Sequence, residues 1–431
     1  MNRTSDALKT LSELIKIPSV EGAPECGAPF GRENLRALNY MLSVCSNLGF
    51  RTVSGDGYYG YAEIGDSDKP LFGVLTHLDV VPVSEGWSHH PFGGVIDGGY
   101  LWGRGALDDK GPAVAAVCAC RELLDEGLKL SKRIRFIFGS NEESGWRCIE
   151  KYLENEEIPS LAFSPDADFP VIYCEKAVSH VGALFPLPSG IADFKAGTRV
   201  NIVPDLAECV LESGALSASP EALPEGVTRT ENGFKAVGKA AHGSSPSAGD
   251  NAAVKLLKFI SSFIPSAKKL YDICAFSDGS GMGLKASAPD YGALTVNPGV
   301  FRAENGKIAV SFDFRHPASV TTEDIVKRLG ELGGEEISVS GKHRPLLMPK
   351  DHPLVAALTE AYREVTGDNA EPVSIGGATY ARALPAAVAF GPVFPGEESN
   401  IHQTDERVSL DSFEKTMKIY KAALKKLCFT E

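Results

Sequence analysis

Residues 71–79, LFGVLTHLD, place a continuous apolar run directly before a histidine and an aspartate. Such a run, without polar alternation, is typical of a strand that is buried on both faces in a parallel sheet. Residues 112–124 predict an Ala-rich helix that ends near Gly127, and residues 133–139 and 160–164 predict two more strands. This alternation of strand and helix indicates an α/β domain with a mainly parallel sheet and flanking helices.

The pattern changes after about residue 177. An α+β module is expected there, with strands at 178–185, 199–211, 234–240, 291–300, 307–314 and 336–340 and helices at 250–264 and 322–332. A helix is expected from Pro353, closed by Gly367, and a last one over 412–427, with Asp411 and Glu414 as its capping box. Because 431 residues exceed the usual size of one core, we predict a split domain, 1–177 and 351–431, with an inserted domain at 178–350.

Composition narrows the function classes. The formal net charge of −13 disfavours nucleic acid or an anionic membrane as a partner. No apolar stretch approaches the roughly 18 residues of a membrane span. Near the N-terminus, Leu8, Leu11 and Ile15 recur at helical spacing, with possible caps at residues 4–6 and a stop at Pro18. We expect a surface helix here rather than a signal peptide, and hence a cytoplasmic protein.

The cysteines agree with that location. There are nine, an odd number, scattered along the chain without a CxxC motif. We expect all of them to be reduced thiols that mostly fill the core.

Acidic residues and histidines gather where the predicted strands and loops end. They are His77 and Asp79, Asp108 and Asp109, Glu142 and Glu143, Asp166 and Asp168, and His402 with Asp405 and Glu406. Each group alone has an ordinary alternative: a solvated histidine, a helix cap at Asp108 or an acidic loop. In open α/β sheets, however, ligands bind at the carboxyl ends of the strands. Together these side chains can supply the oxygen and nitrogen ligands of two divalent cations.

The charges support this interpretation. Three ligand carboxylates and a bridging hydroxide would balance two divalent ions. Without metal, Asp79, Asp108, Glu142, Glu143 and Asp166 would repel one another, so metal binding should stabilise the site.

Nine stretches in a fixed order carry a resemblance to a known family: THLDVVPVSEGW, WGRGALDDKGPAVAA, NEESGW, SPDADFPVIYCEK, RVNIVPD, AHGSSPSAGDNA, DFRHP, GGATYAR and IHQTDE, between residues 76 and 406. The sequence resembles the co-catalytic zinc metallopeptidases, which include carnosinases, aminoacylases and the acetylornithine and succinyl-diaminopimelate deacylases. It is most similar to the PepV-type, Xaa-His dipeptidase branch. The resemblance implies catalysis by the split domain and a lid in the inserted domain.

The resemblance also implies roles for single residues. Asp108 would bridge two metal ions, with His77 and Asp166 on one ion and Glu143 and His402 on the other. Glu142 would be the general base, and the Asp79 carboxylate would orient His77. The Asp108–Asp109 peptide would be cis.

In the lid, His242 would reach the scissile carbonyl oxygen, and Asn201 would assist it. Arg315 would hold the substrate carboxylate, and the turn at Gly376 and Gly377 would offer backbone N–H groups. A turn residue at His242 and a lid salt bridge at Arg315 are the ordinary alternatives. Ala378 stands where the family usually has a third glycine.

The expected activity is hydrolysis of free dipeptides by a water molecule activated by two divalent ions, most simply Zn²⁺, with Mn²⁺ or Co²⁺ as alternatives. An N-acyl amino acid deacylase with the same metal site is the main alternative, followed by an inactive binding protein and by a purely structural role. In PepV-type enzymes an enlarged lid supplies its own histidine, and the inserted segment here is similarly large, so the resemblance implies a monomer.

Overall fold

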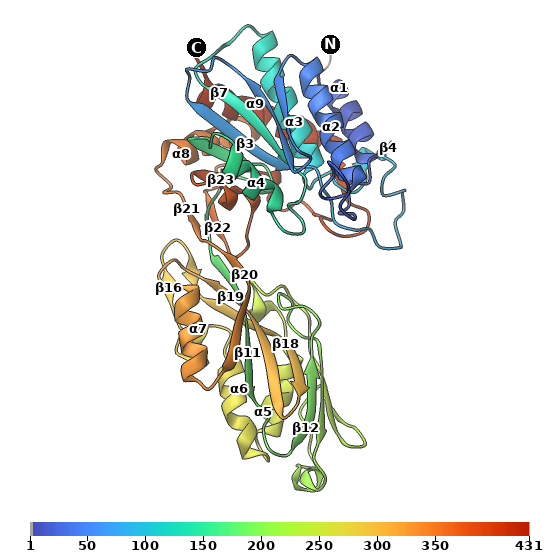
Figure 1. Cartoon of the computed structure of the whole chain (residues 1–431), viewed down its shortest axis with the longest axis vertical. Helices are drawn as coiled ribbons and strands as arrows, with labels where there is room; N and C mark the ends of the chain where they lie inside the picture. The colour runs from blue at the N-terminus through green and yellow to red at the C-terminus, as the bar shows by residue number, and fades with distance from the viewer. Residues whose placement is uncertain (1–2, 431) are drawn as a thin grey trace. The chain divides into compact units, whose positions relative to one another are not determined.

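The computed structural model describes residues 3–430, which form two compact units (Figure 1). The first unit contains the chain up to Tyr173, Leu347–Val373 and the chain from Thr379 onward. The second unit contains Cys174–Leu346 and the short segment Ser374–Ala378. The sequence interpretation had placed residues 374–378 in the split domain.

The first unit contains most of a mixed sheet with the strand order β1-β2-β7-β3-β8-β23-β10-β21, in which β22 also pairs with β10. The bounds are β1 Arg51–Gly55, β2 Tyr59–Ile64, β7 Arg133–Gly139, β3 Leu71–His77, β8 Leu161–Ser164, β23 Ala387–Ala389, β10 Ile172–Glu175, β21 Leu346–Leu347 and β22 Val373–Ile375. The central strands β7, β3, β8 and β23 are parallel, whereas β1, β2 and β10 pair antiparallel. Every residue of β3 is buried, so the predicted α/β fold is confirmed.

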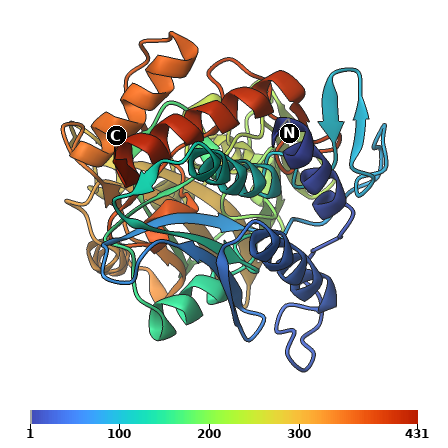
Figure 2. The same cartoon turned by 90° about the horizontal axis from the view of Figure 1, so that it is seen from above.

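Helices cover both faces of this sheet, with α3 and α9 on one face and α2 and α4 on the other (Figure 2). The helices of the unit are α1 Arg3–Ile15, α2 Arg32–Asn47, α3 Lys110–Asp125, α4 Arg147–Asn155, α8 Pro353–Thr366 and α9 Leu410–Cys428. Small side chains let α3 be buried on nearly all sides. The predicted capping box of α9 is wrong: the chain passes from β25 directly into the helix, so Ser409 is the N-cap and accepts from the Ser412 N–H.

Three small sheets complete the unit. They pair β25 Arg407–Ser409 with β5 Tyr100–Trp102 and β4 Val95–Asp97, β24 Pro392–Val393 with β9 Ala167–Asp168, and β26 Phe429–Thr430 with β6 Lys129–Leu130. The β25–β5 pairing is antiparallel. It brings the segment after His402 beside the loop that leads to Asp108.

The second unit combines an antiparallel sheet with helices, in agreement with the predicted α+β module. Its antiparallel sheet has the order β14-β15-β13-β12-β18-β19-β11-β20. The bounds are β14 Val227–Arg229, β15 Gly233–Val237, β13 Leu206–Leu211, β12 Ile191–Ala196, β18 Thr295–Glu304, β19 Lys307–His316, β11 Ala177–Pro186 and β20 Glu335–His343; β16 Ser287–Ala288 and β17 Gly292–Ala293 pair separately. The helices α5 Ala252–Ile260, α6 Lys268–Cys274 and α7 Thr322–Glu331 contribute Leu256, Leu270 and Ile325 to its core.

One predicted strand is shorter than expected. Residues 199–211 were expected to form one strand, but β13 begins only at Leu206. Pro204 lies just before it, and proline cannot donate a ladder hydrogen bond. The segment 199–205 is therefore a loop that carries Asn201.

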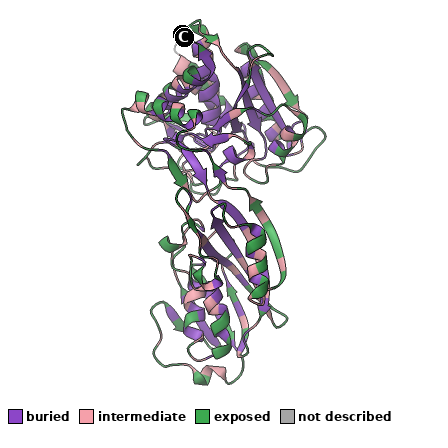
Figure 3. Cartoon of the chain, turned by 90° about the vertical axis from the view of Figure 1, so that its left-hand side faces the viewer, coloured by how far each residue is buried: buried purple, intermediate pink, exposed green. Residues whose placement is uncertain are grey.

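Burial follows the sheets, whose central strands are buried while the edge strand β20 is largely exposed (Figure 3). The nine cysteines all lie in the described chain and are free thiols; Cys26 is exposed and the others are buried. Among residues 3–430, none of the helices combines the length and the apolar character that crossing a membrane requires.

Candidate metal centre

The sequence-predicted ligands of the first unit meet at one edge of its sheet. His77 is the last residue of β3, Glu142 and Glu143 follow β7, and Asp166 follows β8. Because these three strands are parallel neighbours, their carboxyl ends lie side by side. Buried apolar strands thus bring residues from three distant parts of the sequence together.

Asp108 lies between two imidazoles, with one carboxylate oxygen facing each. Its Oδ1 is 2.9 Å from Nε2 of His77, and its Oδ2 is 2.8 Å from Nε2 of His402. The residue precedes α3 in the loop after Gly103, and the Asp108–Asp109 peptide is cis, as the resemblance implied. A carboxylate that presents one oxygen to each of two histidines has the geometry that a bridging metal ligand needs.

The other predicted ligands lie in the same cluster. Nε2 of His402 is 3.0 Å from Oε2 of Glu143, and Nε2 of His77 is 3.8 Å from Oδ1 of Asp166. There are two groups of three residues in which the donor atoms all lie within 4.8 Å of one another. One group is His77, Glu142 and Asp166, and the other is His77, Asp108 and Glu143. Nitrogen and carboxylate oxygen donors at these separations fit divalent cations such as Zn²⁺. Glu142, which we predicted as a base, also lies within ligating range.

The electrostatics reflect an excess of negative charge. Burial, together with the charge of Asp108, raises the pKa of Glu143 to about 7, and burial raises the pKa of Asp166 to about 6. Burial and the charge of Asp166 hold the pKa of Glu142 well above its usual value. Hydrogen bonds to Asp108 and Glu143 raise the pKa of His402 to about 10. Protons thus compensate for crowded carboxylates, and a divalent cation would do so more strongly.

Asp79 links the histidine to the glutamate pair. Its Oδ1 accepts the backbone N–H of Glu142, and its Oδ2 accepts that of Glu143, both at 3.0 Å. Nδ1 of His77 is 3.0 Å from the backbone oxygen of Asp79 but 3.5 Å from its Oδ1. The backbone of Asp79 is therefore the nearer partner of His77, and its carboxylate fixes the glutamate loop, a role that the sequence did not reveal.

A tryptophan contacts Glu142 directly. The indole N–H of Trp146 donates to Oε1 of Glu142 at 2.9 Å, and its ring packs edge-on against Tyr380. The spacing of four residues within NEESGW was the only sequence signal for this contact.

Comparisons with known proteins agree with this geometry. Residues 73–426 match the model of peptidase family M20/M25/M40. A Bacillus subtilis (strain 168) protein named "Putative dipeptidase YtjP" is 35% identical over 99% of this chain and 98% of its own length. A Staphylococcus saprophyticus relative with the same type of name is also 35% identical, over 98% of this chain and 97% of its own. The chain belongs to peptidase family M20/M25/M40.

Solved structures share the fold of this M20 family member at low sequence identity. Human carnosine dipeptidase 1 aligns with a TM-score of 0.59 at 16% identity, covering 98% of this chain and 97% of its own. The aminopeptidase PepT from Bacillus cereus aligns with a TM-score of 0.62 at 14% identity, covering 98% of each chain.

The predicted substrate residues of this M20 chain gather within the second unit. The Gly243 N–H donates to the Asn201 carbonyl oxygen at 2.7 Å, and Ile202 forms a β-bridge with His242. His242 is exposed, and its Nδ1 is 2.7 Å from Oγ of Ser244. The loop that begins at residue 199 and the AHGSSP segment are thus held together.

Arg315 belongs to the same cluster and forms a salt bridge within it. Its Nε and Nη2 donate to the two carboxylate oxygens of Asp313 at 2.7 and 3.0 Å, and its Nη1 donates to the Gly376 carbonyl oxygen at 3.3 Å. A substrate carboxylate would have to meet the remaining Nη hydrogens. The roles of these residues, and that of Gly377, stay predictions.

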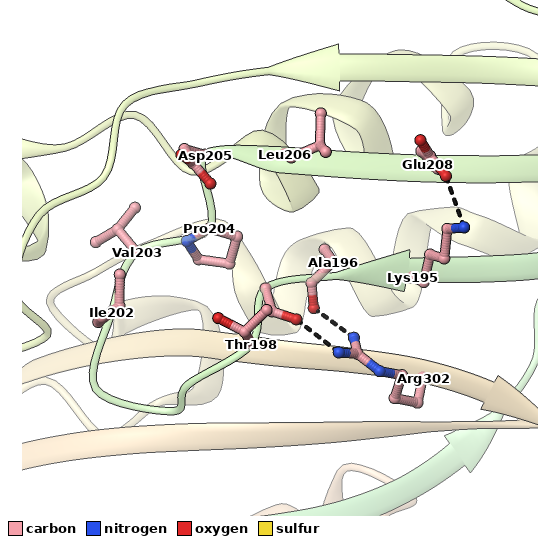
Figure 4. A pocket seen from close by; sticks show the side chains of 11 residues that line it. Lys195, Ala196, Thr198, Ile202, Val203, Pro204, Asp205, Leu206, Glu208 and Arg302 are labelled. Carbon is pink, nitrogen blue, oxygen red and sulfur yellow. Dashed lines mark hydrogen bonds and ion pairs between the residues drawn. The ribbon is translucent and has the colours of Figure 1, made fainter. Parts of the chain in front are cut away.

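A cavity of the second unit lies beside the loop that carries Asn201 but lacks the donor set of a metal centre. A cavity of about 410 Å³ opens in the second unit beside Ile202 and Pro204 (Figure 4). Three of its charged side chains are partnered: Lys195 pairs with Glu208 at 2.8 Å, and Arg302 donates to the carbonyl oxygens of residues 196 and 197. Its walls hold no cluster of metal ligands or nucleophiles.

Proposed function

We propose that the protein is a metal-dependent dipeptidase whose reaction centre is the cluster around Asp108. The observation that carries this proposal is the position of the Asp108 carboxylate between His77 and His402, with Glu142 and Glu143 alongside. Membership of peptidase family M20/M25/M40 and the dipeptidase names of full-length relatives support the same activity.

Two divalent cations would be held by His77, Asp108, Glu143, Asp166 and His402, in the roles that the resemblance implies. When bound, such ions lower the pKa of water toward neutrality and polarise the amide carbonyl. Zn²⁺ suits these donors best, and Mn²⁺ or Co²⁺ are the alternatives.

Glu142 is the residue that moves the proton. In the proposed reaction its carboxylate takes a proton from the attacking water and returns it to the departing amine nitrogen. The Trp146 N–H and the Asp79 carboxylate hold the glutamate segment in place. A base that is fixed in this way needs little reorganisation during the reaction.

We propose that residues of the second unit contact the substrate. There, His242 and Asn201 would stabilise the carbonyl oxygen of the scissile bond, and Arg315 and the Gly376–Gly377 turn would hold the free carboxylate. We further propose that the enzyme acts in the cytoplasm as a monomer. A sedimentation experiment that shows an obligate dimer would overturn the oligomeric state.

A hydrolysis panel on purified, metal-reconstituted protein tests the activity. Free dipeptides, including β-alanyl and D-residue variants, are compared with their N-acetylated forms and with N-acyl amino acids, each in Zn²⁺, Mn²⁺ and Co²⁺. The proposal expects cleavage of free dipeptides only. Cleavage of acyl amino acids instead would reassign the enzyme as a deacylase, and no turnover with bound metal would favour a binding protein.

A further inference from the structure

Glu406 is a fully buried carboxylate that binds the backbone of the loop carrying Asp108. Its Oε1 accepts the backbone N–H groups of Gly105 and Leu107 at 3.0 Å and that of Asp108 at 3.3 Å. Its Oε2 accepts from Nη1 of Arg104 at 2.7 Å. One side chain therefore contacts four residues of the loop that ends at Asp108: the backbone of three of them and the guanidinium of Arg104.

The arginine makes this arrangement possible. A lone buried carboxylate next to Asp108 would add negative charge to a site that already has too much. Arg104 is itself 1% exposed, and its guanidinium lies 5.2 Å from the ring centre of Trp87. The Arg104–Glu406 pair is neutral as a whole, so it can sit behind the Asp108 backbone without adding net charge to the cluster.

The same residue is close in sequence to another ligand. Glu406 follows His402 by four positions, and its carbonyl oxygen accepts the Gly103 N–H at 2.9 Å. In the segment from His402 to Glu406, two residues have positive φ values: 64° at His402 and 61° at Asp405. This left-handed conformation is costly for residues other than glycine. The loop needs support from its surroundings, and Glu406 joins its end to the Asp108 loop.

We propose that Glu406 is a positioning residue for the metal centre, which fixes Asp108 relative to His402 and thereby sets the affinity for metal ions. The proposal rests on the proposed metal site but not on the identity of the substrate. Residues behind the ligands of metal sites commonly change metal affinity about 10- to 100-fold when they are mutated.

The test is a Zn²⁺ titration of metal-free protein by calorimetry, together with thermal unfolding of the metal-free form. Glu406→Gln keeps the side-chain shape but removes the charge that faces Arg104. Glu63→Gln is the matched control, because Glu63 is also a buried carboxylate of the first unit and accepts from Nε of Arg135 at 2.7 Å, away from the cluster. The expected result is a 10- to 100-fold weaker Zn²⁺ affinity for Glu406→Gln and a change within about twofold for Glu63→Gln.

Equal Zn²⁺ affinities in Glu406→Gln and wild type would overturn the proposal, whatever the loss of thermal stability. If Glu406→Gln does not fold, Glu406→Asp replaces it, since that variant keeps the charge beside Arg104 but is too short to retain all three backbone contacts. An unchanged affinity in Glu406→Asp would then be decisive against the role. Wild-type protein that binds no divalent ion would overturn the proposed function itself, which separates the two failures.

Discussion

The cluster of polar residues around Asp108 and the one around Arg315 differ in how their charges are balanced. Around Asp108, carboxylates crowd together, and the raised pKa values of Glu143 and Asp166 reflect this. Around Arg315, the Asp313 carboxylate faces His180 and is paired with the Arg315 guanidinium, and these two contacts lower its pKa despite burial. The first cluster has an excess of negative charge that a bound cation would neutralise. In the second, the carboxylate and the guanidinium already neutralise each other, and the nearby His242 is exposed. Charge thus distinguishes the proposed cation-binding centre from the proposed substrate-binding cluster.

Metal removal should have the largest effect and should separate the two units. Chelation is expected to abolish activity and to lower the unfolding temperature of the first unit only, since binding at 100 times the dissociation constant adds about 2.7 kcal/mol of stability. Scanning calorimetry with and without Zn²⁺ would resolve this if the units unfold separately. A shift confined to the second unit would contradict the assignment.

Glu142→Ala tests what the first cluster does beyond binding metal. Loss of a general base is expected to lower kcat by about 10²- to 10⁴-fold while the bound metal content stays unchanged. Atomic absorption and steady-state kinetics measure the two quantities. The exposed Glu150→Ala nearby is the control, expected to be active. Loss of metal in Glu142→Ala would identify Glu142 as a ligand, because its carboxylate lies within ligating range.

Arg315→Lys probes the balanced cluster. Lysine keeps the charge but loses the planar fork that binds Asp313 and, in the proposed role, the substrate carboxylate. A hydrogen bond to a charged group contributes about 1.5–3 kcal/mol. We therefore expect kcat/KM to fall about 10- to 100-fold, mainly through a higher KM. Arg302→Lys is the matched control, since Arg302 also binds carbonyl oxygens in the second unit. Equal losses in both variants would reduce Arg315 to a structural role.

The sequence predicted which residues of the candidate metal centre lie close together, because each of them follows a strand or loop whose pattern is clear on its own. An unbroken apolar run such as residues 71–75 is typical of a strand covered on both faces, and polar residues at the carboxyl ends of neighbouring parallel strands lie close together. The strands β7 and β8 and the helix α3 were predicted from their apolar patterns in the same way. The resemblance assigned roles to these residues, and the structure brought the residues themselves together.

What the sequence missed depends on contacts between distant residues. Nothing near Glu406 in the sequence indicates that it binds backbone groups of residues 105–108. The N-cap of α9 was misplaced by two residues because Ser409 and Asp411 are both good caps, and only the preceding strand decides between them. The strand expected from residue 199 failed at Pro204, where the missing N–H outweighed the apolar pattern.

Trp146→Phe should give the smallest effect and is the finest test of how the first cluster is built. Phenylalanine keeps a ring that can pack against Tyr380 but removes the N–H that Glu142 accepts. One hydrogen bond contributes about 0.5–1.5 kcal/mol, so kcat should fall about two- to tenfold with KM and metal content unchanged. Trp102→Phe, which removes an indole N–H bound to the Asp97 carbonyl oxygen, is the control. If both variants lose rate equally, the indole stabilises the fold and Glu142 is oriented by the Asp79 contacts alone; if only Trp146→Phe does, the base is held from both sides.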